Sequence, residues 1–300
     1  MDLRLKKYTQ MNRPKYSLIV KAVFLIIVTI FFQSGCASKI MLYPQIADRF
    51  EREHPVDPGN YDNTFSVVKV ENKFGNKITG WLFDKKNNYG SIIVASGNAM
   101  GLGRAYNYNK YLLQTNHRIL LISYQGYGKN EGTANLDSLI SDIKSFYRHL
   151  KAAYKDEPIY FVGISIGTSA GICSVSDEIK FNKLVVEGAV NPKTVAFTKA
   201  TQWWPLFPIV YPLALAVSLS VPDELDISEC ISKLNNIPIL FIHHKKDKLA
   251  PYEPAKDLYS NYKGPKLFLE PTVSTSSYFH LNVKDNIKMQ DEILIFLTDP

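Results

Sequence analysis

A serine between two glycines, where an apolar run gives way to small residues, constrains this fold more than any other feature. Residues 160 to 171 are YFVGISIGTSAG, which places Ser165 in Gly163-Ile164-Ser165-Ile166-Gly167. The apolar run predicts a buried strand, and the small residues after it are suited to the start of a helix. A turn this sharp has no room for side chains two positions either side of the serine. The alternative is a chance match in a turn rich in glycine and serine, but the strand and helix around it favour a strained turn with an exposed hydroxyl.

The first 35 residues have the composition of an export signal. They hold six basic residues and one acid, and an apolar stretch from 22 to 32 ends in Gln33-Ser34-Gly35-Cys36. The stretch is short for a membrane span, although a retained anchor is an alternative. The segment resembles a bacterial lipobox, in which the cysteine is acylated and becomes the new N-terminus, except that Gln33 stands where leucine is usual. We therefore expect a signal peptide over 1–35 and lipidation of Cys36.

Cleavage at this point changes what the composition implies. It leaves 265 residues, enough for one sizeable α/β core, and lowers the formal net charge from +7 to +2. A chain so close to neutral lacks the basic surface that a nucleic-acid partner requires. Cys173 and Cys230 remain, and their spacing matches no metal or redox motif. A disulfide is an alternative in an oxidising compartment, but we expect two separate buried thiols.

The pattern of apolar residues after the signal predicts one α/β domain. Residues 36–63 are polar and irregular and predict a tether, which leaves the domain over 64–300. Alternating residues in 65–70 and 78–83 predict an antiparallel hairpin. Unbroken apolar runs follow, separated in most cases by helix-length amphipathic segments, at 91–95, 119–123, 159–162, 184–186, 237–242 and 267–269. Such runs are typical of parallel strands buried on both faces, so we expect a mostly parallel central sheet flanked by helices.

The predicted sheet brings an acid and a histidine to the same edge as the serine. A serine hydroxyl is a poor nucleophile until a histidine takes its proton, and the histidine needs an acid that fixes its tautomer. Asp247 follows the strand at 237–242, and His280 lies between the last strand and the last helix. Both positions are carboxyl ends of parallel strands, where open α/β sheets build their sites. The alternatives are an ordinary solvated acid at Asp247 and an ordinary loop histidine at His280.

A metal site at His243-His244 is disfavoured. Adjacent side chains at a strand end point apart, and no further ligands occur at zinc spacing.

Several motifs make the chain similar to the α/β-hydrolases, in particular to small membrane-associated serine hydrolases that lack a large cap. The similarity extends from Met41-Leu42-Tyr43-Pro44 to the final helix. Ser96-Gly97-Asn98-Ala99 resembles the family's His-Gly-Asn-Ala loop, and Tyr124-Gln125-Gly126-Tyr127-Gly128 its Tyr-Arg-Gly-Tyr-Gly segment. His243, Asp247 and Pro251 match its His-Gly-x-x-Asp-x-x-Val-Pro pattern.

The resemblance implies roles for individual residues. Ser165 would be the nucleophile, His280 the base and Asp247 the acid that orients the base, with no metal or organic cofactor. The backbone N–H groups of Asn98 and Ile166 would form the oxyanion hole. The chain lacks the glycine usual beside the histidine, and it departs from the family pattern at Ser96, Gln125 and His244.

An uncharged segment between Lys199 and Asp223 interrupts the alternation of strands and helices. It is long enough for a membrane span, but its prolines and its place between two strands of one sheet argue against a simple span. In the related hydrolases this slot, about 192–232 here, holds a small lid. We expect either a buried helical hairpin or an apolar lid that contacts lipid or forms an acyl pocket, with Trp203 and Trp204 at the interface.

These observations predict a lipid-anchored serine hydrolase of the bacterial cell envelope that cleaves a carboxylic ester, thioester or related acyl bond. The substrate class is a small acyl compound or a lipid, and neither the acyl group nor the oligomeric state follows from the sequence. Ala37 after a lipidated Cys36 resembles Gram-negative lipoproteins of the outer membrane. Two alternatives stay open: a catalytically silent envelope protein that binds a ligand in the pocket, and a peptidase on the same scaffold.

Overall fold

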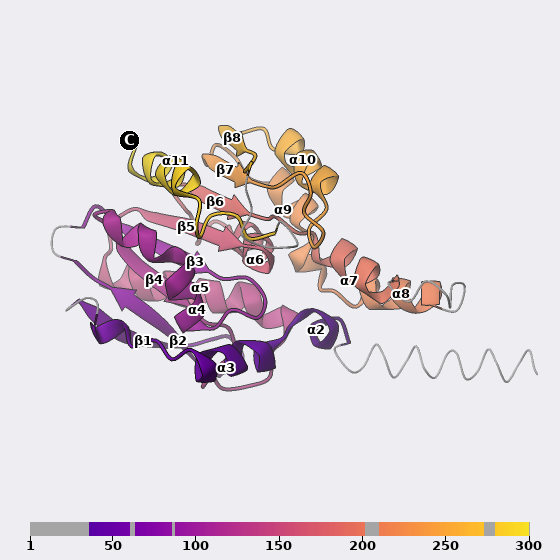
Figure 1. Ribbon diagram of the computed structural model, residues 1–300, viewed down its shortest axis with the longest axis horizontal. Helices are drawn as coiled ribbons and strands as arrows, with labels where there is room; N and C mark the ends of the chain where they lie inside the picture. The colour runs from indigo at the N-terminus through magenta and orange to yellow at the C-terminus, as the bar shows by residue number, and fades with distance from the viewer. Residues whose placement is uncertain (1–35, 61–63, 86–87, 202–209, 273–279, 300) are drawn as a thin grey trace, which may run out of the picture.

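A single eight-stranded sheet positions the rest of the chain in the computed structural model of the protein (Figure 1). The structure describes residues 36–60, 64–85, 88–201, 210–272 and 280–299. The strands are β1 (Phe65–Glu71), β2 (Lys77–Phe83), β3 (Ser91–Ala95), β4 (Arg118–Ile122), β5 (Ile159–Ile164), β6 (Leu184–Glu187), β7 (Ile239–Ile242) and β8 (Lys266–Leu269).

The sheet is mostly parallel, as predicted. Its strand order is β1-β2-β4-β3-β5-β6-β7-β8. Strands β1 and β2 form an antiparallel hairpin, and β2 also pairs antiparallel with β4. Every neighbouring pair from β4 to β8 in this order is parallel. The carboxyl ends of β3, β5, β6 and β7 therefore meet at one edge.

Two hydrophobic cores lie on opposite faces of this sheet. Successive strand residues belong to different cores, such as Phe161 and Val162 of β5, because side chains alternate along a strand. One face is covered by helices α5 (Leu136–Ala153), α6 (Ile166–Ser174), α9 (Ile227–Ser232) and α10 (Tyr252–Asn261). The other is covered by α4 (Leu102–Asn109), the short 3₁₀ helix Lys110–Gln114, and α11 (Ile287–Thr298). Burial on both faces of the sheet explains why the parallel strands are mostly apolar and do not alternate with polar residues.

Helices occupy part of the segment expected to be an irregular tether. The first is α2 (Cys36–Met41), the second is α3 (Pro44–Glu53), and a 3₁₀ turn follows at Pro58–Asn60. Ala37, Met41, Leu42 and Ala47 are buried in the same core as α5. The expectation of an irregular segment over 36–63 is therefore wrong for these residues, because a few well-spaced apolar side chains suffice once another element supplies the surface that they cover.

The insert forms two packed helices, α7 (Pro192–Thr201) and α8 (Val210–Leu219), before a 3₁₀ turn at Asp223–Leu225 leads into α9. Figure 1 shows this pair extending from the body of the molecule beside α2, which contacts both helices. We call α7 and α8 the arm. No helix within the described ranges is long and apolar enough to cross a membrane.

Candidate active site

The turn at Ser165 has the strained geometry that the sequence predicted. Ser165 has φ 54°, a left-handed value uncommon for a residue with a side chain, and α6 begins at the next residue. A methyl group on Gly167 would lie 2.2 Å from the carbonyl oxygen of Ala95, so only glycine fits there. The backbone N–H of Ser165 donates to the carbonyl oxygen of Glu187, at 2.8 Å, which ties the turn to the end of β6. The half-buried serine is thus held between two neighbouring strands.

Asp247 and His280 are in direct contact. Nδ1 of His280 lies 2.7 Å from Oδ2 of Asp247, and both side chains are buried. The other carboxylate oxygen of Asp247 accepts the backbone N–H groups of Leu249 and Ala250, each at 2.8 Å. The carboxylate is therefore fixed by its own loop, and it orients the imidazole with the Nε2 side turned away from it.

The imidazole of His280 also lies close to the serine turn. A methyl group on Gly188 would come within 2.9 Å of Cε1 of His280, so the ring passes directly over this glycine. Gly188 follows Glu187, the residue whose carbonyl holds the N–H of Ser165. Ser165 follows β5, Asp247 follows β7, and His280 lies in the chain between β8 and α11, against Gly188 at the end of β6. The three residues therefore lie at one edge of the sheet.

Glu187 is a residue of this region that the sequence analysis missed. It is buried at the end of β6, and Oε1 accepts the hydroxyl of Tyr108 at 2.6 Å and the backbone N–H groups of Asn282 and Val283 at 2.7 and 3.1 Å. Burial raises the pKa of this carboxyl, and the hydrogen bonds oppose the rise. The side chain fixes the loop that carries His280. The signal available in the sequence was an acidic residue at the end of an otherwise apolar strand.

Asn98, predicted in the oxyanion loop, is held by its side chain. Oδ1 of Asn98 accepts the backbone N–H of Tyr43 at 2.8 Å and the hydroxyl of Tyr127 at 3.0 Å, and Nδ2 donates to the carbonyl of Met41. The next residue, Ala99, has φ 60°. Ile166 is the first residue of α6, where helix N–H groups lack partners within the helix. The loop after β3 is thus braced by the connection between α2 and α3, while an oxyanion hole at Asn98 and Ile166 stays a prediction.

Two of the departures from the family pattern, Gln125 and His244, form local contacts of their own. Oε1 of Gln125 accepts the side-chain amides of Asn72 and Asn76 at 2.9 and 2.8 Å, and its amide donates to the carbonyl of Thr133. Nδ1 of His244 accepts the backbone N–H of Lys246 at 2.9 Å. The two loops that carry these departures are therefore fixed by the residues present.

His243 has a structural partner. Its Nε2 donates to the carbonyl of Ala250 at 2.8 Å, and burial lowers the pKa of its imidazole, which favours the neutral form. Within the described residues, no group of three or more His, Cys, Asp or Glu side chains could hold a metal ion.

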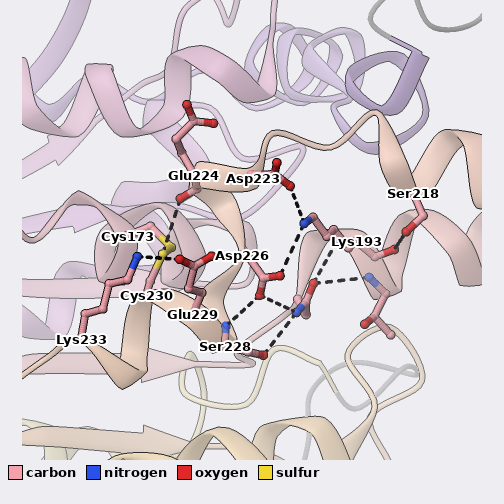
Figure 2. A network of polar contacts seen from close by, with 12 residues as sticks. Cys173, Lys193, Ser218, Asp223, Glu224, Asp226, Ser228, Glu229, Cys230 and Lys233 are labelled. Atoms are coloured by element: carbon pink, nitrogen blue, oxygen red, sulfur yellow. Dashed lines mark hydrogen bonds and ion pairs between the residues drawn. A yellow bond between two sulfur atoms is a disulfide. The ribbon is translucent and has the colours of Figure 1, made fainter.

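A disulfide corrects the expectation of two separate thiols. Cys173, near the end of α6, is bonded to Cys230 of α9, with Cα atoms 5.1 Å apart and a sequence separation of 57. Spacing along the chain could not reveal this bond, because α6 and α9 become neighbours only when both cover the same face of the sheet. Figure 2 shows the bond beside a polar network at the base of the arm.

That network fixes the point where the arm leaves and rejoins the body. Nζ of Lys193, in α7, lies 2.7 Å from Oδ1 of Asp223 and 3.5 Å from Oδ2 of Asp226. The hydroxyl of Ser218, in α8, donates to the carbonyl of Lys193 at 3.0 Å. The arm lies within the segment expected to be an insert, at about 192–232, whereas Trp203 and Trp204 lie outside the described residues.

The strand order, the turn at Ser165 and the flanking helices together define an α/β-hydrolase fold. The solved structure of the Pyrococcus furiosus esterase Pf2001 shares it, with a TM-score of 0.65 at 16% sequence identity, covering 81% of this chain and 93% of that one. The α/β-hydrolase fold that the sequence predicted is thereby confirmed.

Sequence comparison finds distant relatives. The uncharacterized protein YfhR of Escherichia coli K12 is 25% identical over 269 residues, which cover 85% of this chain and 87% of YfhR. The lysophosphatidylserine lipase ABHD12 of Xenopus tropicalis is 23% identical over 189 residues, 57% of this chain and 46% of that protein. No protein-family model matches the chain.

Proposed function

We propose that the protein is a serine hydrolase that cleaves a carboxylic ester, thioester or related acyl bond. The observation that carries the proposal is the buried pair of Asp247 and His280 beside the strained turn at Ser165. The similarity to an esterase in fold and to a lysophosphatidylserine lipase in sequence supports the same class of reaction.

In the proposed mechanism, Nε2 of His280 takes the hydroxyl proton as Oγ of Ser165 attacks the carbonyl carbon. The negative charge that forms on the carbonyl oxygen is stabilised by the backbone N–H groups of Asn98 and Ile166. His280 then passes its proton to the leaving group, and an acyl-enzyme remains. A water molecule, deprotonated by His280, releases the acid and restores the serine. Asp247 keeps the imidazole in the required tautomer throughout.

A fluorophosphonate probe tests this proposal, because it reacts only with an activated serine. Wild-type protein should be labelled, Ser165→Ala should not, and Ser260→Ala, at an exposed position of α10, should be labelled like wild type. Absence of labelling in folded wild-type protein would contradict the proposal and favour a silent binding protein. A panel of acyl esters against aminoacyl amides then separates an esterase from a peptidase.

We further propose that the protein is anchored by lipid at Cys36 and faces the periplasm or the outside of a bacterial cell, in the outer membrane. The disulfide of Cys173 and Cys230 supports export, because such bonds persist in oxidising compartments and are rare in the cytosol. Mass spectrometry of the protein from its membrane fraction tests this. An acylated N-terminal peptide that begins at Cys36 is expected, and a chain that retains residues 1–35 would contradict it.

A further inference from the structure

One face of α8 exposes large apolar side chains in a row. Tyr211, Leu215 and Leu219 are 44%, 44% and 62% exposed, and their spacing of four residues places them along one side of the helix. Ala214 and Val217, on other sides, are buried. The ring of Tyr211 packs edge-on against Phe197 of α7, and Leu219 is the most exposed residue of the row. We call these three residues the apolar row.

The base of the arm gives this row a fixed orientation. Lys193 joins α7 to Asp223 and, less closely, to Asp226, just after α8 (Figure 2). The disulfide then attaches α9, which follows, to the helix that begins after Ser165. The apolar row is therefore carried on a braced pair of helices, and it is not the chance exposure of a loose chain end.

The charge of the surrounding helices suits an anionic surface. Helices α2, α7 and α8 contain three lysines and no aspartate or glutamate: Lys39, Lys193 and Lys199. Lys193 is neutralised at the base of the arm by Asp223. Lys39 is exposed, and Lys199 is half-buried against the ring and hydroxyl of Tyr43. An apolar helix face with basic residues on the helices that contact it is a combination that binds the headgroup region of anionic bilayers.

The start of the described chain lies beside the same helices. Cys36 begins α2, and α2 contacts both α7 and α8. The sequence before it contains the uncharged apolar stretch from 22 to 32. Whether that segment is retained or replaced by lipid on Cys36, the attachment to the bilayer joins the protein next to the arm. A surface so close to the attachment point is brought to the membrane without a separate binding step.

We propose that the apolar row of α8 is a membrane contact, with α8 lying along the surface of the bilayer that holds the N-terminus. The proposal rests on the proposed membrane attachment and is independent of the hydrolase chemistry. It assigns the arm a lipid surface as its partner.

Photo-crosslinking in vesicles tests the contact on the full chain. The protein is reconstituted into vesicles of phosphatidylethanolamine and phosphatidylglycerol that contain a diazirine phospholipid, and labelled residues are mapped by mass spectrometry. Residues 210–219 should be labelled about fivefold more than α11, which exposes Ile287 and Ile295 but lies away from the arm. Leu215→Ser combined with Leu219→Ser should remove most of this difference. The matched control, Leu267→Ser with Ile295→Ser at 56% and 62% exposure, should leave it intact.

The other outcomes overturn the proposal in distinguishable ways. A chain that does not enter the vesicles defeats the membrane attachment itself. A chain that enters but labels α8 no more than α11 defeats only the contact. Self-association in detergent that is lost in the Leu215 and Leu219 double variant would instead assign the row to a second copy of the chain. Circular dichroism of the same samples reports folding, and fluorophosphonate labelling reports the proposed serine chemistry separately.

Discussion

The edge of the sheet at Ser165 and the arm differ in how closely individual residues are fixed. At the edge, the backbone takes conformations that few residues tolerate, such as φ 54° at Ser165, and the surrounding carboxylates are buried and hydrogen-bonded. The arm has regular helices, no charge from 200 to 222, and apolar residues on several sides of α8. Changes at the edge should therefore be severe and specific to a residue, whereas the arm should depend on its base and on its total apolar surface.

The largest expected effect concerns the acid at the edge. Asp247→Asn keeps the shape of the side chain but stabilises the wrong tautomer of His280, so kcat on an activated ester should fall by about 10⁴-fold. Asp257→Asn, on the exposed side of α10, is the matched control and should retain wild-type activity. Near-normal turnover in Asp247→Asn would show that another group orients the imidazole.

Next in size is the steric requirement at the serine turn. Gly167→Ala places a methyl group 2.2 Å from a backbone oxygen that cannot move aside, so the free energy of unfolding should fall by about 4 kcal/mol. Gly128→Ala is the control for backbone conformation alone, because φ is +60° there and nothing lies within 4 Å. It should cost about 1 kcal/mol in the same urea titration. Equal losses of stability in Gly167→Ala and Gly128→Ala would contradict the conclusion that the close approach of the Ala95 carbonyl to Gly167 determines this turn.

The base of the arm should respond to loss of its covalent bond. Replacing Cys173 and Cys230 together by alanine should lower the free energy of unfolding by about 3 kcal/mol, which lies within the range that is usual for a disulfide. Chemical denaturation under oxidising conditions measures the loss. Identical stability of variant and wild type would mean that the polar contacts of Lys193 hold the arm without help.

The smallest effect is a pH dependence that comes from a buried carboxyl outside the arm. Burial raises the pKa of Asp142 in α5, which accepts the backbone N–H of Gln125, to about 6. The folded state thus binds this proton more tightly than the unfolded state does, so stability is greatest at low pH and falls as pH rises from about 4 to 6. The loss from this group is about 2 kcal/mol between pH 4 and pH 7.

Asp142→Asn tests that dependence. Urea titrations of both proteins at pH 4 and pH 7 should show a shallower change in the variant. Parallel curves for variant and wild type would contradict the assignment.

The arrangement at the edge of the sheet could be predicted from the sequence because its geometry permits few residue types. Glycine was required two positions from Ser165, and unbroken apolar runs required strands covered on both faces. Asp247 and His280 followed from their places after strands and from the resemblance to known hydrolases. The disulfide did not follow, because contact between α6 and α9 depends on packing across one face of the sheet. The role of Glu187 could not be predicted for a similar reason, since its hydrogen-bond partners come from α4 and from the loop after residue 280.

The brace on Asn98 has a practical consequence for anyone who trims the chain. Residues 41 and 43 hydrogen-bond with the side-chain amide of Asn98, and residues 37 to 47 cover part of the core. A shortened protein starting near residue 64, where the first strand begins, would lose these partners and uncover apolar surface. Solubility screens with such a truncation would test a protein whose loop at Asn98 has lost its support, so an expression boundary belongs at or before residue 36.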